Sequence, residues 1–310
     1  MADYKTPLHI IVLQDHFDQI LEAAFVKNVL FHAIERPVIF LPVNPQQPVP
    51  IVDNCIYLSL CNTMVPTILA AIDHGKKNVG VLHMGDELGD LDCSWYGRVD
   101  YVLRNYWFED RMNLLSSRCR NILWIPNGYG SGVGPRSPSN LAPTSLRTIS
   151  YYFAGSIPKN HPSTAERIAM RDALIRHKLP AMLNVTDGFG QGLKPPTYAA
   201  FLENARFALI PRGRAEETIR LFVALECGAI PVTLPRRFLN ALAAMKNAPL
   251  IQLDSWDLLN QLDDWASATP SEDIDRIQRD MLSWWGGFKA TVQRKVAEAV
   301  ERSFRTYGVR

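Results

Sequence analysis

Short apolar runs of strand length recur along this chain, and helical stretches separate them. Runs in which successive residues are apolar are typical of strands buried on both faces of a parallel sheet, because helices then cover each face. The pattern therefore predicts an α/β fold built of parallel βαβ units. The expected strands are 9–13, 38–41, 55–60, 79–83, 100–104, 121–126, 149–154, 180–185, 205–210, 229–234 and 250–253.

Helical periodicity fills the intervals between these runs. The expected helices are 17–32, 65–74, 163–177, 197–203, 217–227, 255–266 and a long last helix from the turn at 269–272 to about residue 304, with a break at Gly286-Gly287. Ser163 is the expected N-cap of its helix, with Glu166 in the capping-box position.

A stretch rich in Gly, Ser and Pro, 127–148, divides the chain nearly in half. Such a composition is typical of a connection between folded segments. We predict a first Rossmann-like domain at 1–130, a linker at 131–148, a second Rossmann-like domain at 149–270, and a long C-terminal helix at 271–310 that packs back on the first domain. The two domains are expected to face each other across a cleft.

The bulk composition narrows the class of protein. Of the 310 residues, 47% are hydrophobic and 21% charged, which is ample for two folded cores. The net charge of +2 gives no electrostatic reason to expect nucleic acid as a partner. The chain has five cysteines, and none of them form a Cys-x-x-Cys pair. We therefore expect neither a zinc site nor a disulfide framework. This use of cysteine is typical of a protein in a reducing compartment.

Targeting signals are also missing from the sequence. The N-terminus enters a strand without a basic region or a small-residue cleavage site, which is unlike a signal peptide. There is no run of about 18 apolar residues, so no integral membrane segment is expected. We expect a cytoplasmic protein, which could lie against the inner face of a bacterial membrane. The sequence leaves the oligomeric state open.

The segment 207–234 reads as strand, charged loop, amphipathic helix, Gly turn and strand. Arg212 and Arg214 follow the first strand, and Arg220 lies in the first turn of the helix, where free N–H groups also favour an anion. Glu226, near the helix end, could accept hydrogen bonds from ribose or sugar hydroxyls. The alternative is an exposed arginine-rich turn with i,i+3 pairs such as Glu217 with Arg220.

A second turn could serve the same ligand. Gly155-Ser156 ends the first strand of the second half, and backbone N–H groups in such a turn can bind a diphosphate. A plain turn is the competing interpretation.

The segment 207–234 resembles the exostosin-type glycosyltransferases, in which a strand precedes Pro-Arg-Gly, a helix with Arg and Glu, and Gly-x-Ile-Pro-Val. The pattern here is Pro211-Arg212-Gly213, Arg220, Glu226 and 228–232. Further segments look like the ribitol xylosyltransferase branch of that superfamily, namely 83–87, 101–107, 152–156, 281–289 and 301–304. The resemblance covers roughly 79–304. It implies a GT-B fold, an inverting mechanism and a UDP-sugar donor, which is UDP-xylose in the animal enzyme. That enzyme is membrane-anchored, whereas no anchor is expected here.

An inverting transfer needs a base that deprotonates the acceptor hydroxyl. Asp86 and Glu87 follow a strand end on the expected acceptor side, and Gly85 lets the backbone turn sharply there. Either carboxylate could be the base, with a slight preference for Asp86, and His83 could bind the acceptor or orient a carboxylate. The alternative is that Asp86 caps a helix.

The neighbouring strand end supplies two more candidates for the acceptor. The Arg104 guanidinium could clamp a phosphate, such as that of ribitol phosphate, and Tyr106 could stack on a sugar face. Trp107 is better explained as aromatic core at a strand end.

Two Asp-x-Asp segments, Asp90-Leu91-Asp92 and Asp273-Ile274-Asp275, fit the pattern that holds a divalent metal in GT-A glycosyltransferases. With a GT-B fold, neither a metal nor a cofactor is expected. Many retaining GT-B enzymes have Glu-x7-Glu in the loop and helix, and Thr218 stands where the first glutamate would fall, which favours inversion.

These features together predict an inverting glycosyltransferase that moves a sugar, xylose in the nearest resemblance, from a UDP-sugar to a hydroxyl of a polysaccharide or polyol-phosphate acceptor in cell-surface glycan synthesis. The competing hypothesis is a non-catalytic nucleotide-sugar-binding partner within a polysaccharide assembly complex. A two-domain oxidoreductase is disfavoured because no strand is followed by Gly-x-Gly-x-x-Gly.

Overall fold

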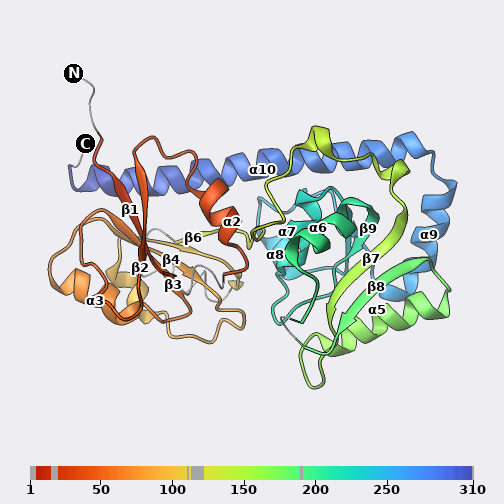
Figure 1. The fold of residues 1–310 in the computed structure, drawn as a ribbon, viewed down its shortest axis with the longest axis horizontal. Coiled ribbons are helices and arrows are strands. Elements are labelled where there is room, and N and C mark those ends of the chain that lie inside the picture. The colour runs from red at the N-terminus through yellow and green to blue at the C-terminus, as the bar shows by residue number, and fades with distance from the viewer. Residues whose placement is uncertain (1–4, 15–19, 110–111, 113–121, 189–190, 309–310) are drawn as a thin grey trace. The chain divides into compact units, whose positions relative to one another are not determined.

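The computed structural model describes residues 5–14, 20–109, 112, 122–188 and 191–308. The chain forms two compact units (Figure 1). Unit 1 comprises 1–127 together with 289–310, and unit 2 comprises 128–288. The predicted linker at 131–148 therefore lies inside unit 2, and the last helix is shared between the units.

Unit 1 contains a six-stranded sheet in the order β2-β1-β3-β4-β5-β6, in which every pair is parallel. The strands are β1 (Leu8–Leu13), β2 (Val38–Val43), β3 (Cys55–Leu60), β4 (Val79–Met84), β5 (Tyr101–Arg104) and β6 (Ile122–Trp124). β3 and β4 are apolar and almost wholly buried, as the continuous apolar runs predict. The helices of this unit are α2 (Ala23–Phe25), the π-helix η1 (Val26–Leu30), α3 (Val65–Asp73) and the 3₁₀ helix η2 (Ser94–Arg98).

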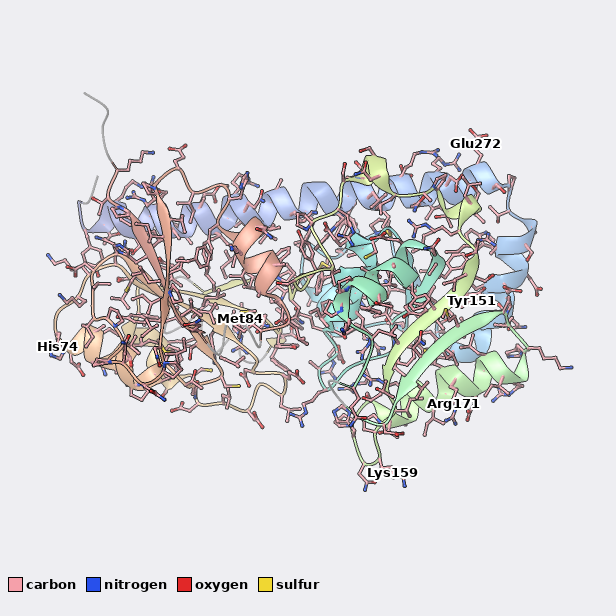
Figure 2. The ribbon with its side chains drawn as sticks, in the orientation of Figure 1. His74, Met84, Tyr151, Lys159, Arg171 and Glu272 are labelled. Carbon is pink, nitrogen blue, oxygen red and sulfur yellow. The ribbon has the colours of Figure 1, made fainter. Side chains whose placement is uncertain are left out.

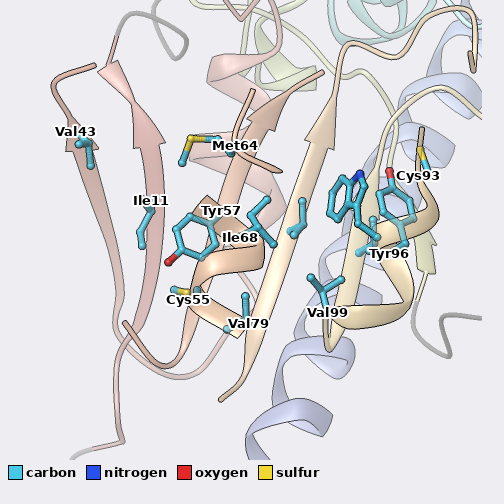
Figure 3. Close-up of a cluster of buried hydrophobic side chains, with 14 residues drawn as sticks. Ile11, Val43, Cys55, Tyr57, Met64, Ile68, Val79, Cys93, Tyr96 and Val99 are labelled. Carbon is cyan, nitrogen blue, oxygen red and sulfur yellow. The ribbon is translucent and has the colours of Figure 1, made fainter. Parts of the chain in front are cut away.

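One face of this sheet is covered by a cluster of apolar side chains from the strands, α3 and η2 (Figure 3). Tyr57 of β3 and Ile68 of α3 lie near its middle, and Tyr96 of η2 lies at the end toward β5. The ring of Tyr96 packs edge-on against Trp95 with centroids 4.6 Å apart. The cluster holds η2 beside the carboxyl ends of β4 and β5.

Unit 2 contains a five-stranded parallel sheet in the order β11-β10-β9-β7-β8. Its strands are β7 (Ile149–Ser156), β8 (Ala181–Thr186), β9 (Ala205–Leu209), β10 (Ile230–Thr233) and β11 (Ile251–Gln252). Its described helices before α10 are η3 (Pro138–Asn140), η4 (Thr144–Leu146), α5 (Thr164–Arg176), α6 (Pro195–Glu203), α7 (Ile219–Glu226), α8 (Arg237–Ala241), η5 (Trp256–Leu258) and α9 (Leu259–Ala268). Neither α8 nor the short helices η3 and η4 were predicted.

The last helix, α10 (Ser271–Thr306), is 36 residues long and belongs to both units (Figure 1). The predicted break at Gly286-Gly287 is wrong, because the helix runs through this pair. In unit 1, the Arg36 guanidinium donates two hydrogen bonds of 2.7 Å to the Glu301 carboxylate and lies 3.4 Å from the centre of the Phe304 ring. The expected α/β class and long C-terminal helix are confirmed.

The Pro- and Ser-rich stretch of unit 2 is fastened to the first half of α10. The Gln278 side chain accepts a hydrogen bond from the Thr144 N–H at 2.9 Å and donates to the Ala142 carbonyl at 3.1 Å. The Asp275 carboxylate accepts from both the N–H and the hydroxyl of Ser145, at 2.8 and 2.7 Å. These bonds explain why the stretch is part of a compact unit despite its composition.

Two local predictions need correction. The helix expected at 17–32 is observed only as α2 and η1, and its first residues, 17–19, lie outside the described part of the chain. Ser163 stands at the N-cap of α5 but makes no side-chain capping bond, since its hydroxyl pairs with His161 Nδ1 at 2.8 Å. Glu166 has other partners, described below.

Within the described residues, none of the helices is both long and apolar enough to cross a membrane.

Candidate functional site

The sheet of unit 2 has a point where the strand order reverses, between β7 and β9. The chain leaves β7 toward β8 on one side and leaves β9 toward β10 on the other. In open parallel sheets, ligands bind outside the carboxyl ends of the strands at such a point. Gly155 and Ser156 end β7, and the loop with Arg212 and Arg214 follows β9, so the structure brings the predicted donor residues to this edge.

Arg220 lies in the first turn of α7 and is bound to the end of β7. Its Nε donates to the Ala154 carbonyl at 2.9 Å, and its Nη1 donates to the Thr218 hydroxyl at 3.4 Å. A Cβ atom on Gly155 would lie only 2.4 Å from Arg220 Nη2. Gly155 therefore provides the space that the guanidinium occupies, which is a role the sequence did not reveal.

Arg167, on α5, is a member of this site that sequence reasoning missed. Its side chain is buried, its Nε donates to the Arg212 carbonyl at 3.2 Å, and its Nη1 donates to the Ser156 carbonyl. Burial, and then the positive charge of Arg220, lower the pKa of Arg167 to about 10, so it stays protonated at neutral pH. The only sequence signal was an arginine in the first turn of a helix, which usually faces solvent.

The loop after β9 is held by Glu166. Its Oε1 accepts the Arg212 N–H at 3.0 Å and also forms an ion pair with Arg236. Arg212 Nη2 donates to the Arg214 carbonyl at 3.2 Å, and among the described residues the buried Nε of Arg212 has no hydrogen-bond partner. The Arg214 side chain is exposed. Cations outnumber carboxylates around this loop, so the edge is suited to an anion.

A hollow of about 210 Å³ adjoins this loop within unit 2. It lies between the first turns of α5, with Glu166, and the residues after β10 and β11, including Leu234, Asp254 and Trp256. The Glu166 side chain lines this hollow and also accepts the Arg212 N–H, so it contacts both the hollow and the loop that carries Arg212 and Arg214.

Glu226 does not lie free at this edge, as the prediction of a ribose-binding role requires. It is 2% exposed; its Oε1 accepts the Arg136 N–H at 2.6 Å, and its Oε2 accepts the Trp285 indole N–H at 2.6 Å. Both oxygens thus tie the 128–148 stretch and α10 to the end of α7. The structure favours a structural role for Glu226.

In unit 1, Asp86 and Arg104 form a buried ion pair at the carboxyl ends of β4 and β5. Arg104 Nη2 lies 3.1 Å from Asp86 Oδ2, with both side chains nearly inaccessible to solvent. Asp86 Oδ1 also accepts the Leu91 N–H at 3.4 Å. No helix starts at Asp86 in the described chain, so the capping alternative is excluded. Pairing leaves neither group available for the roles predicted from the sequence, as preferred base and as phosphate clamp.

His83, on β4, lies behind this pair. Its Nδ1 shares a hydrogen bond with the Tyr96 hydroxyl, and its ring packs edge-on against Trp95 with centroids 5.8 Å apart. Burial, and then the charge of Arg104, lower the pKa of His83 to about 4. His83 is therefore neutral at physiological pH and 1% exposed, which suits an internal polar contact better than contact with an acceptor.

Glu87 is the more accessible of the two predicted carboxylates. It is half-buried, and Tyr106 donates a hydroxyl hydrogen bond of 3.4 Å to its Oε1. Tyr106 has a φ of 57°, an uncommon conformation for a residue of this type. The Gly85 N–H donates to Asn105 Oδ1 at 3.2 Å, so β4 and β5 are joined beside Glu87. Glu87 thus forms the more accessible part of this edge, and the buried Tyr106 supports it.

The Asp-x-Asp segments have other partners. Asp92 accepts from the Ser94 N–H at 2.9 Å, and Asp273 pairs with Arg276 at 2.9 Å. The described residues contain no group of three or more His, Cys, Asp or Glu side chains placed to hold a metal ion.

Part of the second half of the chain is similar to a known protein family. Residues 194–305 match the model of the RXYLT1 C-terminal domain. This range includes the arginine loop, α7 and most of α10. No curated protein sequence matches the chain.

Solved structures give the fold. AviGT4, a glycosyltransferase involved in avilamycin A biosynthesis, is similar with a TM-score of 0.50 and 11% identity, covering 97% of this chain and 99% of that one. An α1,3-fucosyltransferase solved with GDP has a TM-score of 0.49 and 13% identity, covering 91% and 83%. The resemblance predicted from the sequence is confirmed: residues 194–305 are similar to the RXYLT1 C-terminal domain, and the chain has the GT-B fold that was expected.

Proposed function

We propose that this glycosyltransferase moves a sugar from a UDP-sugar to a hydroxyl of a polysaccharide or polyol-phosphate acceptor, with inversion. The observation that supports this most strongly is the excess of arginine at the β7–β9 edge of unit 2, where Arg167, Arg212, Arg214 and Arg220 gather beside Glu166. A nucleoside diphosphate carries the negative charge that suits this cationic edge.

In this proposal, unit 2 holds the donor. Arg212, Arg214 and Arg220 stabilise the charge that develops on the leaving diphosphate, and the N–H groups near Gly155 and Ser156 assist them. The N-terminus of α7 points its free N–H groups to the same edge. Thr218 is the N-cap of this helix and supplies no carboxylate, which is consistent with inversion.

Unit 1 supplies the base. Glu87 is the better candidate than Asp86, because the Asp86 carboxylate is buried against Arg104 while Glu87 is accessible and held by Tyr106. Deprotonation of the acceptor hydroxyl by Glu87, attack on the anomeric carbon and departure of the diphosphate form one in-line displacement. No metal or cofactor is required by this scheme.

Glu87→Gln tests the assignment of the base. We expect transfer to fall by about a hundredfold or more, because positioned general bases contribute about 10²–10⁴. UDP binding, measured by calorimetry, should be unchanged because the donor residues belong to unit 2. Asp90→Asn, which alters an exposed carboxylate three residues away, is the matched control. Full activity in Glu87→Gln would reject Glu87 as the base.

The donor and acceptor are best tested by a screen with mass-spectrometric detection. UDP-xylose with ribitol phosphate acceptors is the first pair, chosen from the RXYLT1 family match, and other UDP-sugars and GDP-sugars follow. Product from another pair would reject xylose and ribitol phosphate but keep the class.

The alternative is a nucleotide-sugar-binding partner without catalysis in glycan assembly. Tight UDP binding without transfer or hydrolysis of any donor would favour it. We place the enzyme in cell-surface glycan synthesis at the cytoplasmic side of a bacterial membrane, and fractionation of expressing cells tests this location.

A further inference from the structure

Two neighbouring residues in the first turn of α5 hold the main chain of Arg212. Glu166 Oε1 accepts the Arg212 N–H at 3.0 Å, and Arg167 Nε donates to the Arg212 carbonyl at 3.2 Å. The N–H belongs to the peptide plane before the Arg212 Cα atom, and the carbonyl belongs to the plane after it. The two bonds therefore fix the backbone on both sides of one arginine.

Each of these residues is also bound to a second strand end. Arg167 Nη1 donates to the Ser156 carbonyl at the end of β7, and Glu166 pairs with Arg236, which follows β10. The first turn of α5 thus connects the carboxyl ends of β7, β9 and β10. This arrangement sets the position of the Arg212 loop relative to Ser156.

The buried charge of Arg167 costs free energy, because the guanidinium loses its contact with water. Arg167 is 4% exposed, and its described hydrogen bonds go to neutral carbonyls rather than to a carboxylate. The charge of Arg220 opposes that of Arg167, and the Glu166 carboxylate offsets this to a smaller extent. An apolar side chain would fill the space at a lower cost in free energy, so the buried charge is better explained by organisation of the anion-binding edge than by stability.

We infer that Glu166 and Arg167 are positioning residues that fix the 211–214 loop in the conformation that receives a diphosphate. This inference rests on the proposed function, since it takes the diphosphate of a nucleotide donor as the ligand. The gain from such positioning is a lower cost of ordering the loop when the ligand binds.

Calorimetric binding of UDP and of inorganic pyrophosphate to the full chain tests this inference. Arg167→Met and Arg167→Lys should both weaken binding by about tenfold, since a lysine keeps the charge but its single ammonium cannot reproduce the planar fork that reaches two carbonyls. Arg171→Met is the matched control, because Arg171 is on the same helix but is partly exposed and pairs with Asp172 (Figure 2). It should leave the affinity within about twofold of the parent.

Hydrogen exchange gives a readout that long-range charge would not change. In the absence of ligand, the peptide containing Arg212 should exchange about tenfold faster in Glu166→Ala and Arg167→Met than in the parent. Unchanged exchange in folded variants would overturn the inference, and so would full rescue of binding by Arg167→Lys, which would indicate charge alone.

The parent protein separates this inference from the proposed function. If the parent binds UDP and Arg167→Met binds it equally well, the positioning role is wrong and the proposed function stands. If the parent binds neither UDP nor pyrophosphate, both are wrong. Should Arg167→Met fail to fold, Arg167→Lys and Glu166→Ala decide.

Discussion

The β4–β5 edge of unit 1 and the β7–β9 edge of unit 2 both gather charged side chains at the carboxyl ends of parallel strands, yet they neutralise charge in different ways. In unit 1, Arg104 is matched by Asp86 in a buried pair. In unit 2, the described hydrogen bonds of Arg167 go to backbone carbonyls, and several arginine side chains gather beside Glu166. At the first edge one arginine is matched by one carboxylate, whereas at the second edge arginine is in excess, which suits an anion.

Similar sequence patterns, charged residues that follow buried strands, can therefore serve either stability or ligand binding. A charged residue after a strand contributes to folding when its counter-charge is internal, and to ligand binding when its counter-charge must come from outside. Changes at the first edge should therefore reduce stability, while changes at the second should reduce affinity for a diphosphate.

The largest effect is expected from Asp86→Asn. It leaves the Arg104 guanidinium buried without its counter-charge, so the free energy of unfolding should fall by about 3–5 kcal/mol. Denaturant titration measures this. The double change Asp86→Asn with Arg104→Met should recover part of the loss, because it removes the unpaired charge. If Asp86→Asn kept its stability and lost only its activity, the structural role of the Asp86–Arg104 pair would be wrong.

Next is the pH dependence that His83 adds to unit 1. Its pKa is near 4 when folded, against an ordinary value of 6.5, so the unfolded chain binds more protons between these values. The stability contribution is present above pH 6.5 and is lost as the pH falls toward 4, by roughly 3 kcal/mol in total. Unfolding experiments from pH 7 to 4 measure the slope, and His83→Gln should flatten it. Equal slopes would contradict the prediction.

At the second edge, Arg220→Met should weaken UDP binding by about a hundredfold, with a smaller loss of stability than Asp86→Asn, because it removes a cation from the proposed diphosphate site. Calorimetry and thermal unfolding on the same sample measure both quantities. A large loss of stability with unchanged UDP affinity would show that Arg220 has a structural role, as the Asp86–Arg104 pair does in unit 1.

The smallest effect is expected from Gly155→Ala. The added Cβ would lie 2.4 Å from Arg220 Nη2 and must displace the guanidinium, so UDP binding should weaken by about tenfold. Gly213→Ala is the matched control in the neighbouring loop, where the nearest atom to an added Cβ is 3.6 Å away. Comparable losses in the two variants would show that sterics at Arg220 are not the cause.

Much of this fold could be predicted from the sequence because buried parallel strands have continuous runs of apolar residues. The run 55–60 is observed as β3 with the same bounds. The last helix shows where local rules fail. Its Gly pair favours a break, but Met281, Trp285, Phe288 and Val292 are buried on either side of the pair, and this packing outweighs a cost of about 1 kcal/mol for each glycine.

The site was harder to predict, since partners are fixed by tertiary structure. The cationic edge could be located because Arg212, Arg214 and Arg220 follow one strand. Arg167 could not be found, because its carbonyl partners lie 11 and 45 residues away. Similarly, Glu226 accepts a hydrogen bond from the indole N–H of Trp285, which lies 59 residues along the chain. No local sequence pattern predicts this contact.

The division of α10 between the units has a consequence for synthesis on the ribosome. Unit 2 is continuous in sequence, so all its strands and helices have been synthesised once residue 288 has been translated. Unit 1 begins earlier but lacks its last segment until 289–306 follows, and Val296, Val300 and Phe304 of that segment are fully buried. The half that is translated first is therefore the half that completes its core last, and until then it presents an uncovered apolar surface to the chaperones of the cell.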